Sequence, residues 1–210
     1  AEKVVYPFGY GLSYTTFDVE TVSAGVVNSN CTSSATAAGS ADADIDIKAG
    51  KLYAKVRVTN TGKAAGKEVV QVYVAKPQGK LGKPAKELVA FEKTRELQPG
   101  ESQLMTLTWK INDMASYDDL GKVQKSAYVL EAGSYDIYVG TSVRDVTKAD
   151  YSYILNHDVI TEQFSAKLVP TSLSKRMLSD GSYEALPQGE PVDTDYSAIG
   201  TIDPALTEGV

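Results

Sequence analysis

Short segments in which apolar and polar residues alternate recur along this chain, with turn sequences between them. The clearest runs from Leu52 to Thr59, and the segments Glu68–Ala75 and Ser102–Ile111 repeat the pattern. Alternation with a period of two gives an extended strand one buried face and one exposed face. No segment shows a convincing amphipathic helical period. A chain of this kind must bury the apolar faces of its strands between packed sheets.

Four further segments are expected to be extended: Thr15–Val22, Leu88–Leu97, Tyr128–Leu130 and Tyr135–Val139. Turn sequences such as Asn60–Gly62 and Gln98–Glu101 separate the strands, because Asn, Gly and Pro favour the backbone angles of tight turns. Seven strands between residues 15 and 146 therefore predict an antiparallel β-sandwich.

The segment before the first strand is the densest in aromatic residues. Tyr6–Phe17 holds five aromatic side chains, and Pro7, Gly9 and Gly11 oppose regular secondary structure there. We therefore expect residues 1–14 to form an irregular arm whose rings need an apolar surface to cover them. That surface is either the core of this chain or a neighbouring domain outside this sequence, and the residues alone leave both interpretations open.

Composition limits the classes of partner. The 210 residues are 42% hydrophobic and 23% charged, a balance that allows a folded core, and the net charge is -6. Nucleic-acid binders need a clustered basic surface, and anionic membranes attract basic segments, so we expect no nucleic acid and no membrane as partner. No apolar run approaches the roughly 20 residues of a membrane-spanning helix.

The only cysteine, Cys31, cannot form a disulfide within the chain, and no signal peptide is visible. Both observations favour a cytoplasmic location. The glycosylation sequon at Asn30–Thr32 has meaning only in a eukaryotic secretory setting, which nothing in the sequence supports.

Beyond periodicity, the chain contains several unusual motifs in a fixed order. They are Pro7–Phe17, Val58–Gly62, Gly66–Val74, Lys86–Lys93, Leu97–Glu101, Glu131–Gly140 and Ser142–Asp145. In this order they resemble the fibronectin type III-like domain of glycoside hydrolase family 3 enzymes, of which β-glucosidases are the commonest members. The resemblance implies an all-β fold: an antiparallel immunoglobulin or fibronectin type III-like β-sandwich at residues 15–146, with extended N- and C-terminal arms.

Two parts of the chain depart from the family pattern. Residues 23–50 are rich in Ser, Ala, Thr, Gly and Asp and are expected to form a variable insertion. Residues 147–210 continue past the last expected strand, which resembles family members with reversed domain order, where the barrel domain follows. We expect 147–210 to be a C-terminal arm and linker, with room for one short helix over Lys167–Leu178.

The resemblance implies a non-catalytic structural domain of a parent β-glucosidase. Such a domain would buttress the catalytic domains of the same enzyme, meet carbohydrate substrate only through that parent, and lend the loop 76–86 to the mouth of the active site. The expected interdomain interface comprises the consecutive residues Tyr6, Pro7, Phe8, Gly9, Tyr10, Gly11, Leu12, Ser13 and Tyr14. The alternative is a freestanding carbohydrate-binding or adhesion module, because sandwich folds host many functions.

No residue of this chain is expected to be catalytic. Glycosidases normally hold two carboxylates about 5 to 10 Å apart around the sugar. The neighbours Asp118 and Asp119 are the most conspicuous pair, but their polar segment predicts a solvated loop. In the family that the chain resembles, the nucleophile belongs to the barrel domain and the acid/base usually to its α/β companion, and no motif of either is present.

No metal and no cofactor are expected. Asp42–Asp46 resembles the start of a calcium loop, but Ile47 and Tyr53 stand where the loop needs Gly and Glu. The sole histidine, His157, has no serine in a nucleophile-elbow motif to activate, so a surface or interface role is the expectation.

Overall fold

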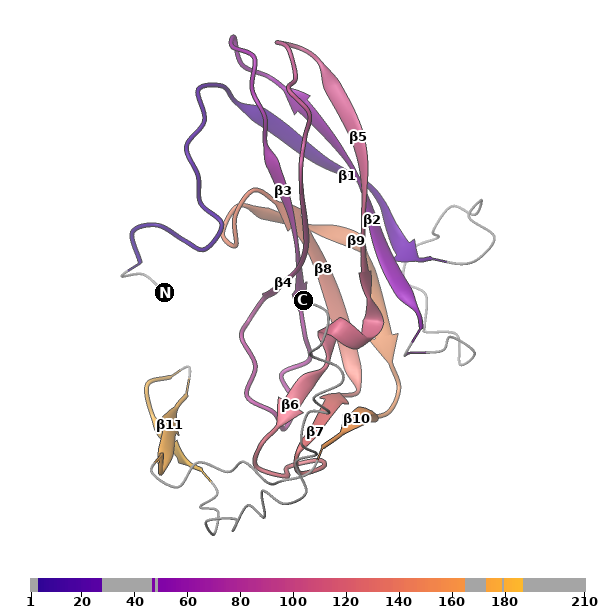
Figure 1. Ribbon diagram of the computed structural model, residues 1–210, viewed down its shortest axis with the longest axis vertical. Coiled ribbons are helices and arrows are strands. Elements are labelled where there is room, and N and C mark those ends of the chain that lie inside the picture. The colour runs from indigo at the N-terminus through magenta and orange to yellow at the C-terminus, as the bar shows by residue number, and fades with distance from the viewer. Residues whose placement is uncertain (1–3, 28–46, 48, 165–172, 179, 187–210) are drawn as a thin grey trace, which may run out of the picture. The chain divides into compact units, whose positions relative to one another are not determined.

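The computed structural model describes residues 4–27, 47, 49–164, 173–178 and 180–186 (Figure 1). The chain divides into two units, 1–164 and 165–210. Two antiparallel sheets form a sandwich in the first unit, as the sequence predicts. The first sheet has the strand order β1–β2–β5, with bounds Phe17–Val26, Lys51–Asn60 and Ser102–Lys110. The second has the order β4–β3–β8–β9, with bounds Glu87–Lys93, Val69–Ala75, Gly133–Gly140 and Val146–Leu155.

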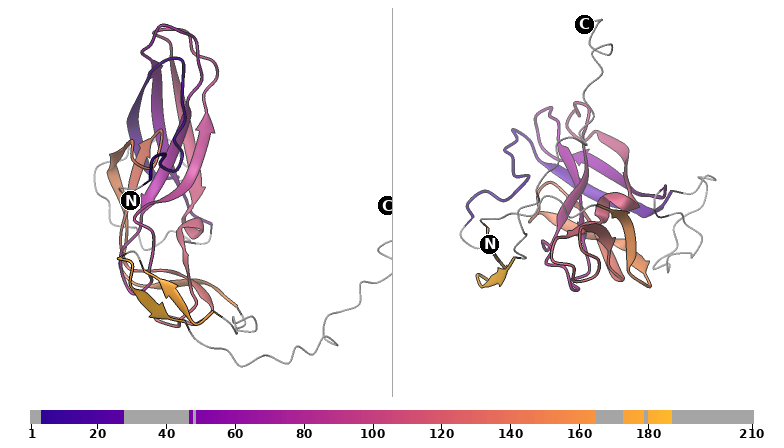
Figure 2. Two further views of the ribbon diagram at one scale, coloured as in Figure 1. Left: turned by 90° about the vertical axis from the view of Figure 1, so that its left-hand side faces the viewer. Right: turned by 60° about the horizontal axis from the view of Figure 1, so that its bottom comes forward.

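A third sheet lies at one end of the sandwich (Figures 1 and 2). Its order is β10–β7–β6, with bounds Val159–Gln163, Ala127–Leu130 and Ser116–Asp118. A short 3-10 helix, η1 (Ile111–Met114), connects β5 to this sheet. One face of the sheet is covered by Leu81, which packs with Ala127, Val129 and Val123 in a small second core.

The main core consists of the side chains that the period-two alternation assigns to one face. In β2, β3, β5 and β8 the inward sets are almost fully buried: Leu52, Ala54, Val56, Val58, Val70, Val72, Val74, Met105, Leu107, Trp109, Tyr135, Ile137 and Val139. Tyr73, on the opposite face of β3, is also buried at 1% exposed, so this strand is covered on both sides at this position. Burying a large apolar side chain contributes about 1.5–3 kcal/mol, so these faces dominate the stability of the sandwich.

The first strand extends further than its sequence pattern suggested. Residues 23–26, which we placed in the variable insertion, continue β1 and pair with β2. A register shift between Thr21 and Ser23 changes the alternation, after which the consecutive residues Ala24 and Gly25 are both buried. This bulge explains why the pattern ended at Val22. The remainder of the insertion, residues 28–46, lies outside the described residues, as do Asn30, Cys31 and the Asp42–Asp46 motif.

The seventh strand of the sandwich is not the one that the sequence suggested. Tyr128–Leu130 belongs to β7 in the third sheet, whereas β9 completes the second sheet by pairing along β8. Val146, where we placed the end of the sandwich, is the first residue of β9. Ala149, Tyr151 and Tyr153 alternate inward from β9 and join the core, so the periodicity of this strand was visible in the sequence.

In the second unit the structure describes a β-hairpin of β11 (Lys175–Met177) and β12 (Tyr183–Ala185). The short helix expected over Lys167–Leu178 is therefore wrong for residues 175–177. A turn around Gly181, whose φ of 87° suits glycine, lets these residues pair with β12 instead. Among the described residues, no helix is long and apolar enough to cross a membrane.

Candidate interdomain surface

The backbone of the N-terminal arm is fixed to the sandwich by the side chain of Gln71 and by a backbone hydrogen bond from Val143. The side-chain nitrogen of Gln71 on β3 donates to the carbonyl of Gly9 at 3.0 Å and to that of Thr141 at 2.6 Å. The backbone N–H of Val143 donates to the carbonyl of Phe8 at 3.0 Å. Gly9 has a φ of 80°, and a Cβ there would collide with the Gln71 amide, so only glycine fits this contact.

The glutamine is itself held by Tyr73, two residues along the same strand. The Tyr73 hydroxyl donates to the side-chain oxygen of Gln71 at 2.5 Å. Burial raises the pKa of the Tyr73 hydroxyl, which keeps it protonated as a donor. Phe8 lies edge-on against the Tyr73 ring, with centroids 6.5 Å apart and planes at 83°. A buried polar pair on β3 thus sets the conformation of the arm.

Although the arm backbone is fixed, its apolar side chains face solvent. The exposed set, which we call the arm surface, is Val4, Val5, Tyr6, Phe8, Tyr10, Leu12 and Tyr14, with exposed fractions from 48% for Tyr10 to 100% for Tyr14. The Tyr6 and Tyr10 rings lie beside each other at 5.4 Å. Of the five aromatic residues in this segment, Phe17 packs against the main core, whereas Phe8 touches only the buried Tyr73 ring and remains 66% exposed. The core of this chain therefore does not cover the other four rings.

The other predicted interface residues are placed as follows. Pro7 accepts a hydrogen bond from the Tyr10 N–H at 3.0 Å, which closes a turn around Phe8 and Gly9. Gly11 is exposed with open space around it, and the Ser13 hydroxyl accepts from the Thr15 N–H at 3.3 Å. The sequence did not single out Gln71 or Tyr73, although a glutamine within a run of valines is the available signal.

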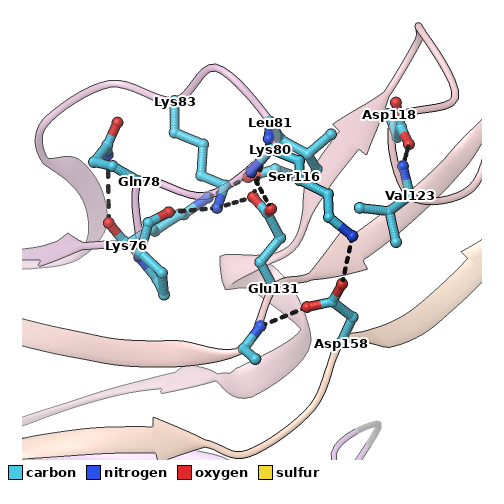
Figure 3. A network of polar contacts seen from close by, with 12 residues as sticks. Lys76, Gln78, Lys80, Leu81, Lys83, Ser116, Asp118, Val123, Glu131 and Asp158 are labelled. Atoms are coloured by element: carbon cyan, nitrogen blue, oxygen red, sulfur yellow. Dashed lines mark hydrogen bonds and ion pairs between the residues drawn. The ribbon is translucent and has the colours of Figure 1, made fainter.

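A second irregular segment, the loop 76–86, is held by a buried carboxylate (Figure 3). Glu131, 3% exposed, accepts the backbone N–H groups of Lys80 at 2.5 Å and Leu81 at 3.2 Å. It also forms an ion pair with Lys83, and both of these side chains are less than 5% exposed. The Lys83 ammonium donates further to the carbonyl of Pro77 at 2.6 Å. Several hydrogen bonds and one opposite charge thus satisfy the buried Glu131.

Two further ion pairs involve lysines of this loop. Lys76, whose side chain is 2% exposed, pairs with Glu87. The more exposed Lys80 lies 3.8 Å from Asp158, which also accepts the backbone N–H of Ala132 at 2.8 Å. Figure 3 shows the Lys80–Asp158 pair beside the contacts of Glu131. The lysines, glycines and prolines of residues 76–86 predict a solvated loop. This prediction is wrong for Lys76 and Lys83, because buried or half-buried carboxylates compensate their charges.

Asp118, the first residue of the carboxylate pair Asp118 and Asp119, is held within its own loop. Asp118 is fully buried, and its two oxygens accept the backbone N–H groups of Gly121, Lys122, Val123 and Gln124 at 2.7–3.0 Å. Burial by itself raises the pKa of this carboxyl, but the four donors outweigh it and lower the pKa. The expected solvated position is therefore wrong for Asp118, whose carboxylate closes its own loop.

The described residues contain no group of three His, Cys, Asp or Glu side chains placed to hold a metal ion. His157 is exposed on the surface beside Asp158.

The third sheet carries a second group of exposed rings, which we call the aromatic row. Tyr117, Tyr128 and Phe164 follow one another with centroids 5.5 and 5.8 Å apart and steeply inclined planes. Each is 40–46% exposed. Glu162 on β10 lies directly opposite Tyr128 and is exposed, so a carboxylate borders the row.

Comparison with known proteins agrees with the fold. Residues 68–143 match the model of the fibronectin type III-like domain. The chain is 58% identical to β-glucosidase A of Butyrivibrio fibrisolvens over 94% of its own length, and 40% identical to a β-glucosidase of Ruminococcus albus over 98%. The crystal structure of a β-glucosidase from Paenibacillus barengoltzii superposes with a TM-score of 0.70, at 39% identity over 90% of this chain. These alignments span only 23%, 20% and 20% of the respective relatives.

The fold and the family model define a fibronectin type III-like β-sandwich domain. The chain belongs to the domains of this type that occur in glycoside hydrolase family 3 enzymes. It corresponds to about a fifth of the length of the β-glucosidases that it matches.

Proposed function

We propose that this chain is the accessory domain of a family 3 β-glucosidase and that it fixes the orientation of the catalytic domains through the arm surface. The parent enzyme would hydrolyse terminal β-linked glucose, or a related sugar, with retention. The observation that carries this proposal is the contrast within the arm: a backbone fixed by Gln71 and Tyr73 presents aromatic rings that this chain does not cover.

Such an arrangement is suited to binding another protein domain. Aromatic residues are enriched in the cores of protein interfaces, and water-exposed apolar clusters of this kind mark interaction sites. Because hydrogen bonds to Gln71 and Val143 already order the arm backbone, docking would cost little conformational entropy. The interface would comprise Tyr6 to Tyr14, and its partner would be the catalytic part of the same polypeptide.

The loop 76–86 supports the second half of the proposal, a contribution near the active-site mouth. Its backbone is tied to Glu131 by two N–H donors, and two of its lysines are buried in ion pairs. A loop with this support can hold a side chain within about 0.5 Å of the position that contact with a substrate requires, which loosely held loops cannot do. Lys80 is the exposed charge that it would present.

The test compares two contexts. Replacing Phe8 and Tyr10 by Ala should leave the melting temperature of the isolated chain nearly unchanged, because both rings are largely exposed there. The same double variant should lower the melting temperature and kcat/KM of the parent enzyme. Leu104→Ala is a matched control, since Leu104 is 51% exposed on β5. A parent enzyme that responds to the control and the arm variant alike would contradict the proposal.

A second candidate, a carbohydrate-binding module, is favoured by the aromatic row alone. Tyrosine rings stack on the apolar faces of sugars, and Glu162 would supply a hydrogen-bond acceptor beside them. Titration of the isolated chain with cello-oligosaccharides separates the candidates. Binding at millimolar concentration or tighter that Tyr128→Ala abolishes would support the module. An absence of binding would leave the accessory domain as the better account.

A further inference from the structure

In the hairpin of β11 and β12 the apolar side chains are more exposed than the charged ones, as in an element that binds a partner. On one face the apolar side chains of Met177 and Tyr183 pair across the strands and are 67% and 60% exposed. On the other face Arg176 donates two hydrogen bonds to Glu184, at 3.0 and 3.1 Å, and these side chains are only 30% and 23% exposed. The ion pair is thus better covered than the apolar pair.

A hairpin of this size does not fold stably by itself. Each strand has three residues, and an isolated two-stranded hairpin is at best marginally stable in water. Local bonds help to close it: the Leu178 N–H donates to the Ser182 carbonyl at 2.8 Å, and Asp180 accepts from Ser182 at 2.6 and 2.9 Å. Lys175 also lies 4.5 Å over the Tyr183 ring. None of these contacts buries the side chain of Met177, which is 67% exposed.

We infer that the hairpin is a second docking element, whose Met177–Tyr183 face binds an apolar surface on the catalytic part of the same polypeptide. This inference rests on the accessory-domain function proposed above but concerns a different surface. The alignments with the two bacterial relatives, over 94% and 98% of this chain, are too long to omit residues 173–186. Residues 173–186 therefore fall within the aligned part of polypeptides that are four to five times longer than the segment they share with this chain.

The size of the apolar face favours a partner within the same polypeptide over a second copy of this chain. Stable association between separate proteins usually buries about 1,200–2,000 Å² in total, which two side chains cannot provide. A covalently linked partner is present at an effective concentration in the millimolar range, so a small contact suffices. The cation of Lys175 at the edge of the same face would suit a carboxylate or carbonyl group at the rim of that partner.

The test is amide hydrogen exchange of residues 173–186, measured in the isolated 210-residue chain and in the parent enzyme. We expect fast exchange in the isolated chain and exchange at least about tenfold slower in the enzyme. In the enzyme, the double variant Met177→Ser/Tyr183→Ser should restore the fast rate. Leu104→Ser, a similarly exposed apolar position on the sandwich, should not.

Two outcomes would overturn the inference. If the hairpin is already protected in the isolated chain, it docks within this chain. If it exchanges rapidly in both contexts, it docks nowhere. The Phe8→Ala/Tyr10→Ala variant of the parent enzyme tests the accessory-domain proposal separately. If the hairpin is protected in the enzyme but this variant changes neither the melting temperature nor kcat/KM, the role of the hairpin is supported and the role of the arm is refuted.

Discussion

The N-terminal arm and the loop 76–86 are both irregular segments fixed by one buried polar side chain, yet they use it in opposite ways. Gln71 reaches out from β3 and holds the arm by the carbonyl of Gly9, while the aromatic side chains of the arm remain in water. Glu131 holds the loop by two N–H groups and by Lys83, and the loop buries Leu81 in return. The loop completes its own packing within this chain, whereas the arm does not.

This difference indicates where the domain is self-sufficient. Loops are normally fixed by satisfying their backbone groups, and both segments do so. The loop also contributes apolar surface to a core, so its order depends on this chain alone. The arm offers its apolar surface outward, so the stability that its rings could add depends on a partner.

The largest effect is expected at Glu131. Glu131→Ala removes the acceptor of two N–H groups and leaves Lys83 buried without its charge partner, which typically costs about 3–5 kcal/mol. Urea unfolding of the isolated chain measures this loss. Glu20→Ala, which breaks an exposed ion pair with Arg57, is the matched control and should cost about 0–1 kcal/mol. Equal losses in the two variants would show that the loop is not held by this carboxylate.

A smaller effect is expected at Gln71, the corresponding anchor of the arm. Gln71→Ala leaves the carbonyls of Gly9 and Thr141 without their donor, at a cost of about 1–3 kcal/mol. Limited proteolysis of the isolated chain should then cut the arm much faster while the sandwich remains intact. Tyr73→Phe, which removes only the hydroxyl that orients Gln71, should give an intermediate rate. A cleavage rate that neither variant changes would mean that the arm is held elsewhere.

A third anchor, Asp118, adds a dependence on pH. Its pKa is lowered in the folded chain, so its carboxylate stabilises the fold above the unfolded-state pKa of about 4. This stabilisation disappears as the pH falls through the lower folded-state pKa. Asp118→Asn, which has one acceptor oxygen fewer, should cost about 1–3 kcal/mol at pH 7 and progressively less below pH 4. A loss that is the same at pH 7 and pH 3 would contradict this role.

The sequence predicted the strands, whose apolar residues alternate regularly, and missed the loops, whose conformations depend on single polar contacts. Alternation identified β2, β3, β5 and β8 with their inward faces, because a period of two follows directly from strand geometry. It could not identify Glu131 or Asp118 as buried, since a carboxylate in a turn sequence normally lies in water.

The candidate site was predicted to a similar extent. The aromatic string Tyr6–Tyr14 drew attention by composition alone, but the anchor that fixes it lies more than fifty residues away on β3. Contacts between Gln71 and Gly9 depend on how β3 and the arm meet in space, which no local pattern records. The same reason explains why the burial of Lys83 was missed: its partner Glu131 belongs to a different turn.

The smallest effect is expected at Tyr14, and it sharpens the comparison most directly. Its side chain is fully exposed, so Tyr14→Ser should leave the melting temperature of the isolated chain unchanged within about 2 °C. Leu81→Ala, a truncation in the loop, should lower it clearly, because Leu81 is 5% exposed within the second core. Comparing the melting temperatures of the two variants shows whether the Tyr14 side chain lies on the surface of the isolated chain or in its core. A drop for Tyr14→Ser as large as that for Leu81→Ala would place the ring in the core of this chain and remove the distinction between the two segments.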